Sequence, residues 1–110
     1  MDESQFKTLR ELAKDGTLSQ RDLSRKMGLS LGRVNYVVNA LLKEGYIKAE
    51  RFKNSKNKVG YMYKLTPKGV SEKFQQTQTF LRQKADEFER LRSEIEHLRQ
   101  EAGIGQGKDV

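Results

Sequence analysis

The side chains best suited to chemistry with a ligand are concentrated in residues 30–43. At 100° per residue, one side of a helix built from this segment carries small, amide, aromatic and basic residues and no acid. The members of this polar face are Gly32, Arg33, Tyr36, Asn39, Ala40 and Lys43, with Asn35 at its border. Arginine can form two hydrogen bonds with guanine and asparagine two with adenine, and small residues let the backbone come close. The face therefore predicts contact with the base edges of duplex DNA.

Local signals before and after this segment predict how it is positioned. Ser19 is a good N-cap with Asp22 at the capping-box position, and Gly28 is a natural C-cap, so residues 19–28 form a short helix. Ser30 then caps a second helix that Gly45 ends. Its apolar residues recur at spacings of three, four and seven, which is one buried face: Leu31, Val34, Val38, Leu41 and Leu42. A third helix over residues 2–14 precedes the pair.

A basic hairpin follows the two helices. Residues 46–53 and 60–65 have the composition of strands, and the polar stretch 54–58 between them is rich in turn-forming residues. From position 43 to 68 there are eight basic and two acidic residues. The tip of this hairpin is therefore expected to contact DNA phosphates or an adjacent minor groove. The residues expected to make these contacts are Lys53, Lys56, Asn57 and Lys58. The alternatives are an ordinary solvated helix face and an edge hairpin whose lysines prevent strand pairing, but the serial order of these elements favours DNA.

The run SQRDLSRKMGLSLGRVNYVVNALLKEGYIKAERF, followed by NSKNKVGYMYKLTPKG, resembles the MarR-type winged-helix regulators, most closely the branch of MarR family EPS-associated transcriptional regulators. The resemblance covers residues 6–69. It implies a bacterial, cytoplasmic DNA-binding protein linked to exopolysaccharide biosynthesis genes, with Ser30 opening the recognition helix 30–44 and residues 53–59 forming the wing. The acid-x-arginine element of the family's wing is absent, and one helix follows the wing where larger relatives have several. Whether an effector ligand exists is therefore left open.

The segment 70–102 contains no proline, and a seven-residue apolar repeat predicts a coiled-coil helix opened by Thr66 and Pro67. One series is Phe74, Leu81, Phe88, Ile95 and Ala102, and the second, three positions later, is Val70, Thr77, Lys84, Leu91 and Leu98. Because Thr77 and Lys84 interrupt the apolar seam, the part before Leu81 is expected to pack on the N-terminal domain. The predicted homodimer contacts are Leu81, Phe88, Leu91, Ile95 and Leu98. The alternative is a single amphipathic helix folded back on its own domain.

Charges beside this seam indicate a direction for the pair. Position g holds Glu87, Glu94 and Glu101, and position e holds Arg92 and Arg99. In a parallel pair, g of one chain faces e of the next heptad on the other, so opposite charges meet. An antiparallel pair would place glutamates together, so the sequence predicts parallel helices.

Charge and composition bound the remaining possibilities. Residues 1–69 carry 15 basic and 7 acidic residues, whereas residues 70–110 carry 7 and 8. There is no cysteine and one histidine, His97, on the outer side of the heptad helix, so neither a metal, a cofactor nor catalysis is expected. No apolar run is long enough to span a membrane, and a cytoplasmic location is expected.

The predicted fold is mainly α with a small β-hairpin: a winged helix-turn-helix in residues 1–69, a dimerisation helix in 70–102 and a disordered tail in 103–110. The predicted function is that of a homodimeric, sequence-specific regulator that binds double-stranded DNA. The alternative is a winged-helix module that contacts protein or RNA on a coiled-coil scaffold.

Overall fold

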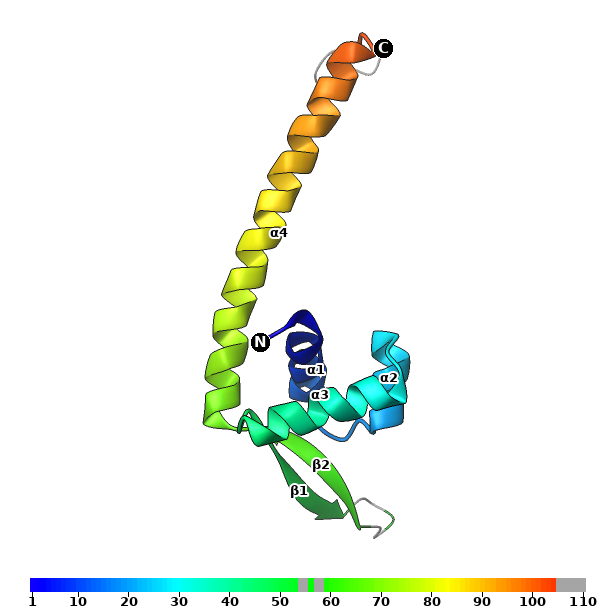
Figure 1. Ribbon diagram of the computed structural model, residues 1–110, viewed down its shortest axis with the longest axis vertical. Helices are drawn as coiled ribbons and strands as arrows, with labels where there is room; N and C mark the ends of the chain where they lie inside the picture. The colour runs from blue at the N-terminus through cyan, green and yellow to red at the C-terminus, as the bar shows by residue number, and fades with distance from the viewer. Residues whose placement is uncertain (54–55, 57–58, 105–110) are drawn as a thin grey trace. The chain divides into compact units, whose positions relative to one another are not determined.

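The computed structural model describes residues 1–53, 56 and 59–104 of the chain (Figure 1). The elements, in chain order, are α1 (Glu3–Lys14), α2 (Gln20–Met27), α3 (Leu31–Lys43), β1 (Ile47–Lys53), β2 (Val59–Leu65) and α4 (Pro67–Glu101). The chain divides into two compact units, residues 1–76 and 77–110. Three helices, an antiparallel hairpin and a long helix in this order confirm the predicted winged helix-turn-helix and C-terminal helix. Most of the predicted tail, residues 105–110, lies outside the described residues.

The predicted caps of α2 and α3 are confirmed. The Ser19 hydroxyl accepts a hydrogen bond from the Asp22 N–H at 3.0 Å, and the Asp22 carboxylate accepts one from the Ser19 N–H at 2.9 Å. That backbone bond is the main reason that the pKa of Asp22 lies below its usual value. Gly28 ends α2 with φ of 65°, and the Ser30 hydroxyl accepts from the Arg33 N–H at 3.1 Å. The turn between the two helices is therefore fixed from both sides.

The core is small, and α3 supplies half of its main cluster. That cluster consists of Leu9, Leu12, Leu23, Val34, Val37, Val38, Leu41 and Ile47. The predicted stripe of α3 is wrong at two positions. Val37 is buried although the stripe omitted it, and Leu31 exposes 46% of its surface although the stripe included it. At 100° per residue Val37 lies beside Leu41 at one edge of the buried arc, whereas Leu31 lies beyond Val38 at the other edge and in the first turn of α3.

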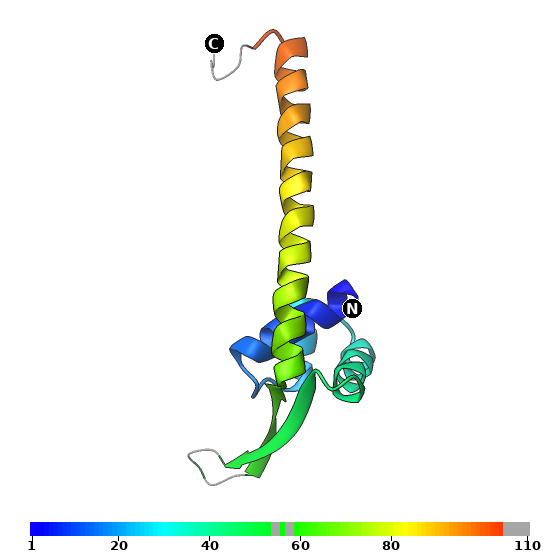
Figure 2. The same cartoon turned by 90° about the vertical axis from the view of Figure 1, so that its left-hand side faces the viewer.

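Strands β1 and β2 form an antiparallel pair in which Ile47 is opposite Leu65 and Lys53 opposite Val59. Figure 2 shows the two strands side by side. The loop after α1 is attached to this hairpin, because the Tyr63 N–H donates to the Gly16 carbonyl at 2.8 Å. A Cβ atom on Gly16 would lie 2.2 Å from the Tyr63 carbonyl oxygen, so this approach requires glycine.

The beginning of α4 is anchored to the segment that follows α3. The Thr66 N–H donates to the Tyr46 carbonyl at 3.1 Å, and the Thr66 hydroxyl donates to the Gly45 carbonyl at 2.5 Å. The same hydroxyl accepts from the Gly69 N–H at 3.0 Å, which confirms Thr66 as the N-cap of α4. Gly69 is buried so closely against Tyr46 that a Cβ atom would lie 1.9 Å from the Tyr46 carbonyl oxygen.

Beyond this anchor, the residues of both heptad series are exposed, whereas Phe80, which belongs to neither series, is half-buried. Val70 and Phe74 expose 57% and 64% of their surface, so these two residues do not supply the packing that was expected for the part before Leu81. Residues up to Gln76 nevertheless belong to the same compact unit as the N-terminal helices and hairpin. The contacts of this end of the helix are made by the side chains of Thr66 and Lys68 and by the backbone of Gly69, all of them with the backbone of residues 44–46. The predicted seam residues Leu81, Phe88, Leu91, Ile95 and Leu98 also lie on the surface. Among the described residues, no helix is both long and apolar enough to cross a membrane.

The anchor at Gly69 gives a stability prediction. Gly69→Ala places a methyl group into the Tyr46 carbonyl, and the backbone must shift to accept it, so unfolding free energy should fall by about 1–3 kcal/mol. Gly32→Ala is the matched control, because its Cβ atom would meet nothing within 4 Å. Replacing a helical glycine in open space should raise stability by about 0.5–1 kcal/mol. Urea denaturation measures both, and equal effects of the two changes would contradict the assigned anchor.

Candidate nucleic-acid interface

The polar face of α3 lies on the surface, opposite the side chains that α3 buries. Val34, Val37, Val38 and Leu41 point into the core, and this fixes the rotation of the helix about its axis. The exposed residues are Ser30, Gly32, Arg33, Asn35, Tyr36, Asn39 and Lys43, and Ala40 is half-buried at the edge. All the residues of α3 that were predicted to contact DNA are thus found on one accessible surface. It carries two cations and no anion.

Arg33 is held at this surface by two weak contacts. Its guanidinium lies 3.6 Å from an Asp2 carboxylate oxygen and 5.5 Å from the centroid of the Tyr36 ring. Asp2 is the N-cap of α1, and its other carboxylate oxygen accepts from the Gln5 N–H at 2.8 Å. Exposed ion pairs are worth about 1 kcal/mol at most. Arg33 is therefore oriented in the free protein and can leave Asp2 for a stronger acceptor at small cost.

The two asparagines of the face are also connected to each other. The Asn39 side-chain amide donates to the Asn35 side-chain oxygen at 3.1 Å, and Asn35 donates to the Gln20 side-chain oxygen at 3.2 Å. Sequence reasoning missed Gln20 and Asp2. Both come from other helices, and only the folded arrangement brings them to α3.

The wing is described in part. Lys53, at the end of β1, and Lys56 are exposed, whereas Asn57 and Lys58 lie outside the described residues. Arg51 stands opposite Tyr61 in the strand register, and both side chains are exposed. The acid of β1, Glu50, pairs with Lys48 at 3.1 Å. The described part of the wing thus presents basic groups, and the adjoining strands add Arg51 and Tyr61.

Two further titratable side chains outside α3 have shifted pKa values and lie at structural positions. Hydrogen bonds from Thr17 lower the pKa of Asp15, which lies in the turn after α1, and burial raises the pKa of Tyr46 at the α4 anchor. Within the described ranges, no three His, Cys, Asp or Glu side chains are grouped to hold a metal ion. The exposed polar face of α3 is the candidate ligand-binding surface.

Comparison with known proteins agrees with this geometry. Residues 1–48 match the family described as winged helix-turn-helix DNA-binding. The E. coli MarR structure is 22% identical, with 89% of this chain and 78% of MarR covered and a TM-score of 0.63. The chain has the fold of MarR. Streptococcus pneumoniae FabT, solved in complex with DNA, is 20% identical over 94% of this chain and 76% of FabT, with a TM-score of 0.55. A MarR family protein of Mycobacterium tuberculosis is 18% identical over 94% and 79% of the two chains, with a TM-score of 0.66. No curated protein matches the sequence.

The Asp2–Arg33 contact yields a prediction about affinity for duplex DNA. Asp2→Asn keeps an oxygen to cap α1 but removes the charge that holds Arg33. Affinity should rise by about 1.5- to 5-fold, the worth of one exposed ion pair, as measured by fluorescence anisotropy. Asp86→Asn makes the same change of net charge on the distal part of α4 and serves as the control. An equal gain in both variants would show that net charge, and not release of Arg33, is responsible.

Proposed function

We propose that this protein is a homodimeric transcriptional regulator that binds operator DNA through the exposed face of α3 and the wing 53–59. The observation that carries the proposal is the capped, core-packed α3 with Arg33, Tyr36 and Asn39 side by side on its accessible face. A helix of this kind fits the major groove, where guanine accepts from arginine and adenine pairs with asparagine. The DNA complex of FabT, which has the same fold, supports this choice of ligand.

The wing adds contacts that do not depend on sequence. Lys53 and Lys56 are exposed cations on the strand end and turn, and Asn57 and Lys58 follow them in the sequence. Lysines in such a position contact phosphates, and a hairpin tip can reach an adjacent minor groove. The excess of basic residues in positions 1–69 supplies the long-range attraction to DNA.

The sequence resemblance to the EPS-associated branch supports a narrower proposal for the regulated genes. We infer that the operators lie at exopolysaccharide biosynthesis genes and that the protein acts in the bacterial cytoplasm. A small-molecule effector is not part of this proposal.

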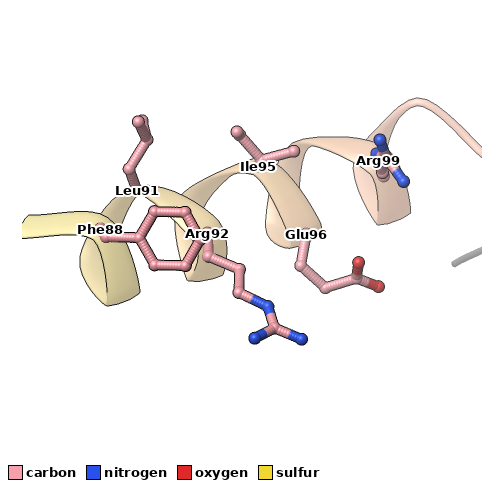
Figure 3. Close-up of a pocket in the computed structure, with 6 residues that line it drawn as sticks. All are labelled: Phe88, Leu91, Arg92, Ile95, Glu96 and Arg99. Carbon is pink, nitrogen blue, oxygen red and sulfur yellow. The ribbon is translucent and has the colours of Figure 1, made fainter. Parts of the chain in front are cut away.

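We propose that a second copy of the chain covers the seam of α4. A groove of about 380 Å³ on the helix is lined by the apolar side chains of Phe88, Leu91 and Ile95 and by the charged side chains of Arg92, Glu96 and Arg99. Figure 3 shows Leu91 and Ile95 on one side of the helix, with Arg92 and Glu96 extending from another. Side chains with this spacing are covered when a second heptad helix interdigitates with them.

Charge complementarity favours a second copy of the same helix as the partner of the seam. In a parallel pair Glu87 meets Arg92 and Glu94 meets Arg99 of the other chain. Lys84, the charged residue in the seam, pairs with Glu87 of its own chain at 3.2 Å. Because Lys84 can hold its ammonium group at the border of the seam in this way, it is compatible with a helix pair.

The first test concerns recognition by α3. The combined variant Arg33→Ala, Tyr36→Ala, Asn39→Ala removes the hydrogen-bonding groups of the face and leaves the buried stripe unchanged. Single changes should each cost about 1–3 kcal/mol on the preferred operator, and the melting temperature should change little. Selection of bound sequences from random duplexes identifies that operator, and titration measures the affinity.

Arg90→Ala is the control, because it removes an equal charge from the outer side of α4. It should leave the affinity nearly unchanged. If the triple variant selected the same operator with unchanged affinity, α3 would not be the recognition helix. Absence of salt-sensitive, sequence-selective binding by the unaltered protein would instead favour a module that contacts protein or RNA.

The second test concerns the helix pair. The chain lacks cysteine, so Ile95→Cys introduces a single thiol at an inner seam position. In a parallel, in-register pair the two thiols face each other, with Cα atoms about 4 to 7 Å apart, and mild oxidation should give a covalent dimer. Ser93→Cys places a thiol two residues away on the outer side and should not crosslink. A protein that is dimeric by sedimentation but resists crosslinking at position 95 would contradict the parallel arrangement.

A further inference from the structure

Three amide side chains form a directed chain of hydrogen bonds across the α3 surface. Asn39 donates to Asn35 at 3.1 Å, and Asn35 donates to Gln20 at 3.2 Å. Asn35 and Asn39 are one turn apart on α3, while Gln20 is the first residue of α2. The chain therefore connects the two helices of the helix-turn-helix through side chains that lie at its surface.

The direction of this chain determines which amide atoms are available to a ligand. A primary amide has two N–H donors and one oxygen acceptor, and rotation by 180° exchanges their places. Asn39 uses one N–H toward Asn35, and among the described residues its oxygen and second N–H have no other hydrogen-bond partner. Adenine offers the complementary pair in the major groove, a donor at N6 and an acceptor at N7. At the other end, Gln20 takes part in the chain through its side-chain oxygen.

We propose that Gln20 is a positioning residue for base recognition. Its side-chain oxygen fixes the amide of Asn35, which in turn fixes the amide of Asn39 in the orientation that selects adenine. This inference rests on the proposed function, because it assigns a base preference and its structural cause to the same α3 surface. Gln20 acts through Asn35 and Asn39, so its replacement is expected to alter selectivity at the base pair that Asn39 contacts.

Two substitutions at position 20 separate orientation from affinity. Gln20→Met has similar length but offers Asn35 only a weak sulfur acceptor in place of the amide oxygen. Discrimination at the base pair read by Asn39 should fall by roughly two- to ten-fold, the range for one hydrogen bond, with other positions unchanged. Gln20→Glu keeps the acceptor and adds a negative charge. It should bind all duplexes more weakly and retain the base preference of the unaltered protein.

Asn39→Ala identifies the relevant base pair, and Gln20→Met combined with Asn39→Ala should be no less selective there than Asn39→Ala alone. Base preferences are measured by selection from random duplexes. If Gln20→Met altered a base pair that Asn39→Ala does not affect, Gln20 would contact DNA directly and the inference would be overturned. The same holds if Gln20→Glu lost the preference as fully as Gln20→Met.

A measurement without DNA distinguishes failure of this inference from failure of the proposed function. In the free protein, the side-chain amide signals of Asn35 and Asn39 in ¹⁵N–¹H NMR spectra should shift in Gln20→Met and stay close to their original positions in Gln20→Glu. Unchanged signals in Gln20→Met would overturn the positioning role even if the protein binds operator DNA. Shifted signals without selective DNA binding by the unaltered protein would overturn the proposed function, and the assigned adenine preference with it.

Discussion

The close contact between Gly69 and the Tyr46 carbonyl is the constraint on which the N-terminal unit depends. It brings together the segment after α3, the start of β1 and the first turn of α4, and no side chain can be accommodated between the two backbones. Thr66 adds hydrogen bonds to Gly45 and Tyr46, and Lys68 donates to the Glu44 carbonyl at 2.7 Å. Backbone contacts of this kind tolerate little displacement, so the end of α3 and the start of α4 are held together.

This constraint matters because α3 has two roles. Four of its residues are in the core, and burying each such side chain contributes about 1.5–3 kcal/mol relative to exposure. The opposite face carries the candidate contacts to DNA. Since core packing fixes the rotation of the helix, the positions of Arg33, Tyr36 and Asn39 follow from the burial of Val34, Val38 and Leu41. Because the core residues and the candidate contacts lie on opposite faces of α3, a substitution on the exposed face can change ligand binding with little effect on the stability of the fold.

Local sequence signals predicted the parts of the fold that depend on neighbouring residues. The caps at Ser19, Ser30 and Thr66 involve groups within three or four positions and were identified correctly. The contacts of Gly69 with Tyr46, Asp2 with Arg33, and Gln20 with Asn35 join residues far apart in the chain. The periodicity of the sequence does not predict such contacts, because they depend on how separate segments pack in the folded chain. For the same reason the sequence indicated the exposed face of α3 but not the residues that orient its side chains.

The distribution of charge suits a protein whose two parts have different partners. Residues 1–69 carry a strong excess of positive charge, which attracts DNA but makes two such units repel each other. The remaining residues are nearly neutral, and their exposed apolar side chains recur along α4 with opposite charges beside them. Repulsion between basic units is screened over about 8 Å at physiological salt, which lowers the electrostatic cost of the proposed pairing through α4. Because the positive charge is concentrated in residues 1–69 and the proposed pairing surface lies on α4, one short chain can present both.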